Sequence, residues 1–159
     1  MTPPRREDAF LVFAQRADAR VDIDAWDAHA MRFFATRIGL TADKRYIAGE
    51  AAPRTDEVTF VVAAYGAPPG VRQVFARPCE AGDYALAEAA DARAGGTGLA
   101  LLARRCGMVW LVAREASPDP IALRLATIMA SVLLGPILDC PANELFGVKT
   151  ARAKIGNLA

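Results

Sequence analysis

The stretch DPIALRLATIMASVLLGPIL, residues 119–138, predicts the longest helix of the chain and decides what the rest of the fold must supply. Asp119 is a natural N-cap, and Pro120 fits the first helical turn, where its missing N–H would have no partner in any case. Large apolar side chains cover most of the circumference, so this helix must be buried on more than one side. Pro136 bends or ends it near Gly135.

A sheet is the expected cover for one side of this helix, and several segments have the composition of strands. Segment 58–66, VTFVVAAYG, is continuously apolar, which indicates a strand covered on both faces. A turn at 67–70 then predicts a hairpin with a returning strand. The strand-forming segments are 9–15, 58–66, 71–77 and 109–113.

A second helix is expected over residues 24–38, because apolar side chains recur there at helical spacing. Asp22 or Asp24 can cap its start, and Gly39 is a natural stop. The side chains that set the period are Ile23, Trp26, Ala30, Phe33, Phe34 and Ile38.

The remaining segments are less regular. Asp83 is expected to cap a helix over 84–94 that ends at the glycines which follow it. Segment 99–105 is either the first arm of a hairpin turning at 106–107 or a short helix, LALLARR, and we slightly favour the hairpin. Residues 40–57 are polar and irregular, with a short strand at 45–48. A last helix is expected over 142–155.

The order of these elements is typical of a small α+β domain. We expect a flexible tail over residues 1–8 and a single domain over 9–159. Its sheet would be antiparallel or mixed, with about five strands, and covered on one face by helices that include the long buried one. Roadblock-like domains and small secretion chaperones, both dimeric interaction proteins, have roughly this order. The likeness is one of architecture alone, because no motif here is diagnostic of either group and such chaperones tend to be acidic.

Charge and cysteine usage exclude several classes. The formal net charge is only +1, which argues against nucleic acid as a partner. Arg124 and Pro136 interrupt the most apolar segment, so too few apolar residues lie between them to cross a bilayer. The chain has three scattered cysteines and one histidine, which give no zinc-ligand spacing and suit reduced thiols. We therefore expect a cytoplasmic protein without a metal or a cofactor.

The stretch AGGTGLALLARR, which holds Gly95, Gly96 and Gly98, loosely resembles a phosphate-binding glycine turn. Such a turn follows a buried strand, whereas ALAEAADARA before these glycines favours a helix. The third glycine position of the fingerprint is also missing. We therefore interpret the glycines as a helix C-cap, and keep a backbone nest that binds an anion or nucleotide as the alternative.

Candidates for catalysis are few. His29 is the one histidine, but Asp24 and Asp27 are not at the helical spacing that would bring them to its face. Cys106 follows two arginines that could lower its thiol pKa, yet the sequence marks no base for it. Ser131 is expected to bond back to its own helix. Glu88 and Asp91 share a helix face that we expect to be solvated, and we assign no catalytic residue.

The leading hypothesis is a non-catalytic, adaptor-like or chaperone-like protein-interaction domain that acts as a homodimer. This hypothesis is based on the surplus of apolar surface on the long helix. The expected contact residues are Trp26, Trp110, Met129 and Leu133. The alternatives are a small-molecule or nucleotide-binding domain that uses Gly95–Gly98, and a small enzyme that uses His29 or Cys106.

Overall fold

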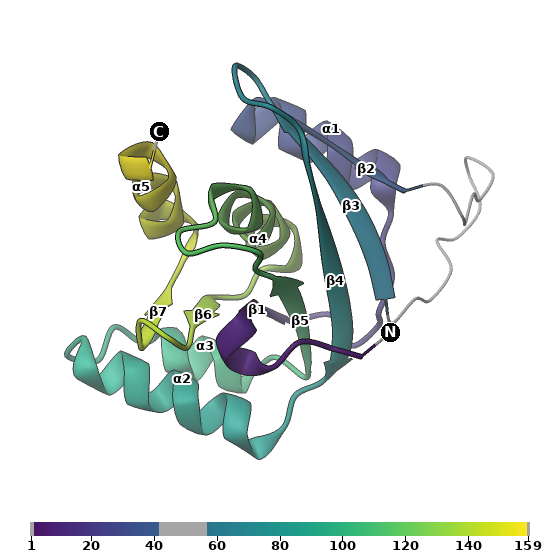
Figure 1. Ribbon diagram of the computed structural model, residues 1–159. Helices are drawn as coiled ribbons and strands as arrows, with labels where there is room; N and C mark the ends of the chain where they lie inside the picture. The colour runs from purple at the N-terminus through teal and green to yellow at the C-terminus, as the bar shows by residue number, and fades with distance from the viewer. Residues whose placement is uncertain (1, 42–56, 159) are drawn as a thin grey trace.

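The computed structural model describes residues 2–41 and 57–158 and contains a seven-stranded antiparallel sheet in the order β2-β3-β4-β5-β1-β6-β7 (Figure 1). The α+β class with one sheet is confirmed, but the sheet has more strands than expected. The strand expected at 45–48 lies outside the described residues. The strands are β1 (Ala9–Ala14), β2 (Thr36–Leu40), β3 (Glu57–Ala64), β4 (Gly70–Pro78), β5 (Met108–Ala113), β6 (Ile137–Asp139) and β7 (Glu144–Phe146).

Helices lie on both faces of the sheet, whereas we expected them on one (Figure 1). The larger core lies under α1 (Ile23–Phe34), α4 (Pro120–Leu133) and α5 (Val148–Leu158). A smaller core lies on the opposite face under α2 (Ala81–Arg93) and α3 (Leu99–Arg104). Residues 6–8, expected in a loose tail, form the 3-10 turn η1 (Arg6–Asp8), and Arg6 pairs with the buried Asp83 at 2.7 Å.

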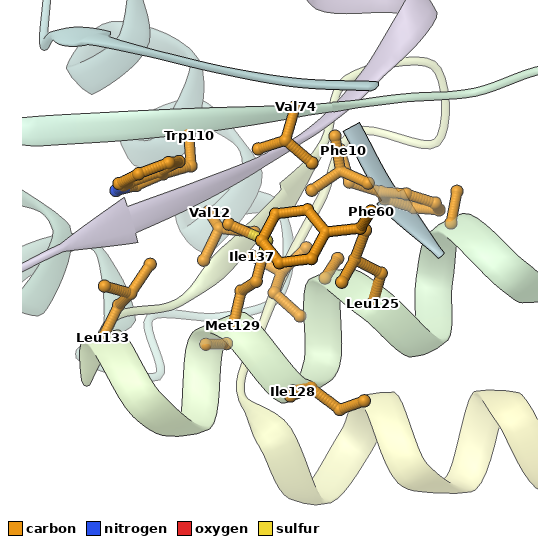
Figure 2. Close-up of a cluster of buried hydrophobic side chains, with 14 of the residues drawn as sticks. Phe10, Val12, Phe60, Val74, Trp110, Leu125, Ile128, Met129, Leu133 and Ile137 are labelled. Atoms are coloured by element: carbon orange, nitrogen blue, oxygen red, sulfur yellow. The ribbon is translucent and has the colours of Figure 1, made fainter. Parts of the chain in front are cut away.

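Helix α4 is the centre of the larger core. Its side chains Leu125, Met129 and Leu133 point toward the sheet, and Ile128 points toward α5 (Figure 2). Asp119 caps the helix as expected, since its carboxylate accepts from the N–H of Ala122. The all-round apolar pattern is therefore explained by burial between a sheet and neighbouring helices.

Helix α4 ends at Leu133, which is earlier than the expected boundary at 138. Leu134 adopts a left-handed conformation with φ 59°, and the chain then turns back against β1. The next residues form β6, where Ile137 pairs with Val12. Pairing with β1 gives their N–H and C=O groups partners that a helix broken at Pro136 could not supply.

The second helix also ends early. Asp22 caps α1 as expected, but α1 stops at Phe34, and Ala35 takes the left-handed conformation with φ 48°. Ile38 and Gly39, which we placed at the helix end, belong to β2. The apolar spacing continued through Ile38 because its side chain enters the same core from the strand.

Four further expectations are corrected. Segment 99–105 forms helix α3 rather than a hairpin arm, and 142–155 is divided between β7 and α5. The N-cap of α2 is Glu80, while Asp83 completes a capping box three residues later. Strand β3 is not covered on both faces, because Phe60 and Val62 are buried and their alternate neighbours are half-buried.

Candidate functional site

The glycine turn lies between α2 and α3, and its backbone amides face a carboxylate of the same chain. Gly95, Gly96 and Gly98 all have positive φ, between 80° and 92°. Asp91, from the last turn of α2, accepts from the N–H of Thr97 at 2.8 Å and from its hydroxyl at 2.5 Å. These hydrogen bonds hold the pKa of Asp91 below its ordinary value. The position that a bound anion would occupy is therefore filled by the Asp91 side chain.

A cavity of about 470 Å³ lies beside this turn, between α2, β7 and the start of α5. Its one arginine, Arg93, donates to the backbone carbonyl of Ala142 at 2.9 Å and more weakly to that of Asn143. The cation therefore ties α2 to the β6–β7 turn. This cavity adds no free positive charge to the glycine turn.

His29 has a partner that the sequence analysis missed. Its Nε2 lies 2.8 Å from Oγ of Ser131, across the interface between α1 and α4. Burial lowers the pKa of His29, and the charges of Arg152 and Arg32 lower it further, so the imidazole is neutral at pH 7. We expected Ser131 to bond to its own helix, but tertiary packing brings it to the histidine instead.

The His29–Ser131 pair lacks the other parts of a hydrolytic site. Within residues 2–41 and 57–158, no carboxylate is hydrogen-bonded to the imidazole, whose ring packs 4.7 Å from that of Phe33. Ser131 lies in the last turn of α4, where backbone N–H groups are committed to the helix and do not converge on an oxyanion. The pair therefore ties α1 to α4.

Cys106 is buried rather than exposed at a turn. Its thiol lies 3.4 Å from the carbonyl of Leu102, and burial raises its pKa to about 11. Burial also raises the pKa of Cys140 to about 11 and that of Cys79 above its usual range. A thiol with such a pKa is protonated at pH 7 and is a weak nucleophile.

The paired carboxylates do not act together. Glu88 forms an ion pair with Arg104, whereas Asp91 faces the glycine turn. Across the described part of the chain, no group of three or more histidine, cysteine or acidic residues has the geometry of a metal site. None of the described helices has the length and apolar content that a membrane span requires.

The four residues expected to form an interaction surface lie in the core: Trp26, Trp110, Met129 and Leu133. Trp26 packs edge-on against Trp110 and parallel to Phe60, with ring centroids 6.0 Å apart in both pairs. They are buried because the sheet covers one side of α4 and α1 packs beside it. An exposed contact surface must therefore be sought elsewhere.

The structure offers one such surface, on the side of β2, β3 and β4 that faces away from α1 and α4. We call it the open face, and it consists of Arg37, Gly39, Thr59, Val61, Ala63, Val71 and Gln73. Val61 and Val71 are directly paired across the strands, and Val71 is 45% exposed. Helices α2 and α3 contribute to the core over β1, β5, β6 and β7, which reaches β4 only at Phe75, beyond this area. The sequence carries little signal for it, because Val61 on the open face and Val62 in the core are the same residue type.

The edge of the sheet beside the open face is blocked at Ile38. The backbone N–H groups of Thr41 and Tyr65 form hydrogen bonds that join the β2 and β3 segments. Odd-numbered residues of β2 therefore bond to β3, and its even-numbered residues point their N–H groups away from the sheet. The outward N–H of Ile38 donates to the carboxylate of Asp27 on α1, at 2.9 Å. Arg37 pairs with the same carboxylate. This part of the edge cannot accept a further strand without breaking those bonds.

Comparison of the chain with models of known protein families, with curated proteins and with solved structures finds no match.

Proposed function

We propose that the protein is a non-catalytic interaction domain that forms a weak homodimer through the open face. The observation that carries this proposal is the cross-strand pair of half-buried Val61 and exposed Val71, in a sheet area with no described helix over it. The β3–β4 turn adds Tyr65, which is 95% exposed. Exposed β-branched and aromatic side chains on a flat sheet favour association with another apolar surface.

A second copy of the chain is the partner that this surface fits. The charged residue of the open face, Arg37, is paired with Asp27, so a charged partner would gain little there. The chain itself presents a flat sheet face whose one arginine is already paired, and a two-fold axis would place the same patch on both sides. A net charge of +1 gives little repulsion between copies. Because Asp27 closes the edge at Ile38, the copies would stack face to face rather than extend the sheet.

The size of the open face sets the expected strength. Three strands about 4.8 Å apart, with seven residues of about 3.3 Å each, outline a patch of roughly 300 Å². Two such patches would bury roughly 600 Å² in total, below the ~1,200 Å² typical of stable interfaces. We therefore expect a Kd on the order of 100 µM or weaker, which is reversible self-association rather than an obligate dimer.

Sedimentation equilibrium of two matched lysine variants tests the proposal. Val71→Lys adds a charge to the open face, whereas Leu101→Lys adds the same charge to α3, where Leu101 is 73% exposed. Both positions are exposed, so both variants should fold. We expect Val71→Lys to raise the dimer Kd about tenfold or more and Leu101→Lys to leave it unchanged. Equal effects of the two variants, or a monomeric wild-type protein at millimolar concentration, would refute the proposal.

The cytoplasm remains the proposed compartment. Its support is that Cys79, Cys106 and Cys140 are all free thiols. Fractionation of cells that express the protein, with its thiols alkylated at lysis, tests this: recovery of disulfide-linked protein from an oxidising compartment would contradict it.

A further inference from the structure

A cavity of about 380 Å³ lies on the other side of the β3–β4 hairpin from the open face, at the start of α4. Its walls come from the hairpin, from the loop that precedes α4, from α4 and from the end of α5. Most of the lining is apolar and includes Val62, Ala64, Pro68, Ile121, Ile155 and Leu158. Such a wall suits the apolar body of a small molecule.

Two of the charged residues that line the cavity neutralise each other. Arg72 donates two hydrogen bonds to Asp119, both at 2.9 Å. Asp119 also accepts from the N–H groups of Glu115 and Ala122, at 2.9 and 3.0 Å. Its oxygens are therefore saturated, and this pair joins β4 to the N-terminus of α4. Neither residue has a charge left to attract a ligand.

Arg124 is the remaining charged residue among those that line the cavity. It is half-buried on α4, and its Nη1 donates a weak hydrogen bond to Oγ1 of Thr36, at 3.4 Å. That hydroxyl already donates to the carbonyl of Phe34. Within the described part of the chain, no carboxylate forms an ion pair with Arg124. A half-buried guanidinium against an apolar wall is a costly arrangement that an anion would relieve.

We propose that this cavity binds a small amphipathic carboxylate, with its carboxylate on Arg124 and its apolar body along Ile121, Ile155 and Leu158. At about 30 Å³ per non-hydrogen atom, the cavity holds a ligand of about twelve such atoms. A single arginine matches a monoanion, because a phosphate dianion would leave a buried charge uncompensated. The site lies on the opposite side of the hairpin from the open face and does not depend on self-association.

Methyl NMR titrations with sodium octanoate and with octanol test this site. Octanol is the matched probe, since it has the same chain without the charge. We expect octanoate to shift the methyl signals of Ile121, Ile155 and Leu158, and to bind about tenfold or more tightly than octanol. Equal affinities would show an apolar cavity without an anion site, and absent shifts at these methyls would show no site. Either result overturns the proposal.

Two variants and one control make the test specific. Arg124→Met keeps the length of the side chain and removes its charge, so it should raise the octanoate Kd about tenfold or more and leave octanol binding unchanged. Arg105→Met, at an exposed arginine on the other side of the sheet, should change neither. Ala64→Leu fills part of the cavity and should weaken both probes, which gives an independent result if Arg124→Met does not fold. Unchanged octanoate binding in Arg124→Met, or in Ala64→Leu, contradicts the assignment.

Discussion

Replacing Asp91 with alanine is the sharpest perturbation of the glycine turn. The carboxylate accepts from the N–H groups of Thr97 and Ala100 and from the Thr97 hydroxyl, so it caps the start of α3 from the end of α2. Loss of a helix cap costs 0.5–2 kcal/mol, and three hydrogen bonds to one charged group place the expected loss at about 2 kcal/mol. For a domain of this length, that corresponds to a fall in Tm of about 4–8 °C.

The same variant should acquire an affinity for anions. Without Asp91, the amides of the turn lose their acceptor and form an anion nest. At inorganic phosphate about tenfold above its Kd, linkage adds about 1.4 kcal/mol to the stability of the variant. The assay is thermal unfolding of wild type and Asp91→Ala in phosphate and in chloride at equal ionic strength. Asp24→Ala, which removes an exposed acid near the N-terminus of α1, is the control.

Two results would refute this reasoning. If phosphate or a nucleotide stabilises the wild-type protein as much as the variant, the turn binds anions with Asp91 in place, and the nucleotide hypothesis returns. If Asp91→Ala melts at the wild-type temperature, the carboxylate does not organise the turn.

The remaining predictions concern stability. Burial raises the pKa of Asp119, but hydrogen bonds from Arg72 and two backbone amides outweigh it and leave the pKa below its ordinary value. Asp119 therefore contributes stability above about pH 4, and this stability is lost as the pH falls toward its folded pKa. Asp119→Asn should be less stable by about 3 kcal/mol at pH 7 in urea titrations. The stability of this variant should also fall less steeply with decreasing pH in the acid range. Trp110→Ala should cost about 4 kcal/mol in urea unfolding. Trp110→Phe should cost only about 1 kcal/mol, because the indole N–H has no hydrogen-bond partner among the described residues. Gly135→Ala should cost about 3 kcal/mol or more, because its Cβ would overlap the backbone of Phe13, whereas Gly107→Ala has open space and should melt within about 2 °C of wild type. A tolerated Gly135→Ala would contradict the packing of the α4–β6 turn against β1.

The sequence was sufficient for elements with a strong local signal. Asp22 and Asp119 both cap the helices expected of them, because an N-cap depends on groups only three residues away. The α+β class followed from the order of helical and strand-like segments. The predicted ends of two helices were wrong, because α1 ends at Phe34 and α4 ends at Leu133. There non-glycine residues take a left-handed turn that tertiary pairing stabilises and local propensity does not mark.

The site was less predictable than the fold. The partner of His29 is Ser131, which is 102 residues away, and no spacing rule relates two helices that meet only in the folded chain. The apolar character of Trp26 and Trp110 was evident, but a single sequence does not distinguish a core tryptophan from a surface anchor. The open face was hidden because Val61 and Val62 have the same hydropathy, although only Val62 is buried.

Methyl NMR of the wild-type protein on dilution tests the proposed interaction most directly. Spectra recorded from about 1 mM to about 20 µM span the expected Kd. The methyl signals of Val61 and Val71 should shift with concentration along one two-state curve, and those of Leu101 on α3 should stay fixed. Constant shifts at Val61 and Val71 over this range, or concentration-dependent shifts confined to other residues, would contradict self-association through the open face.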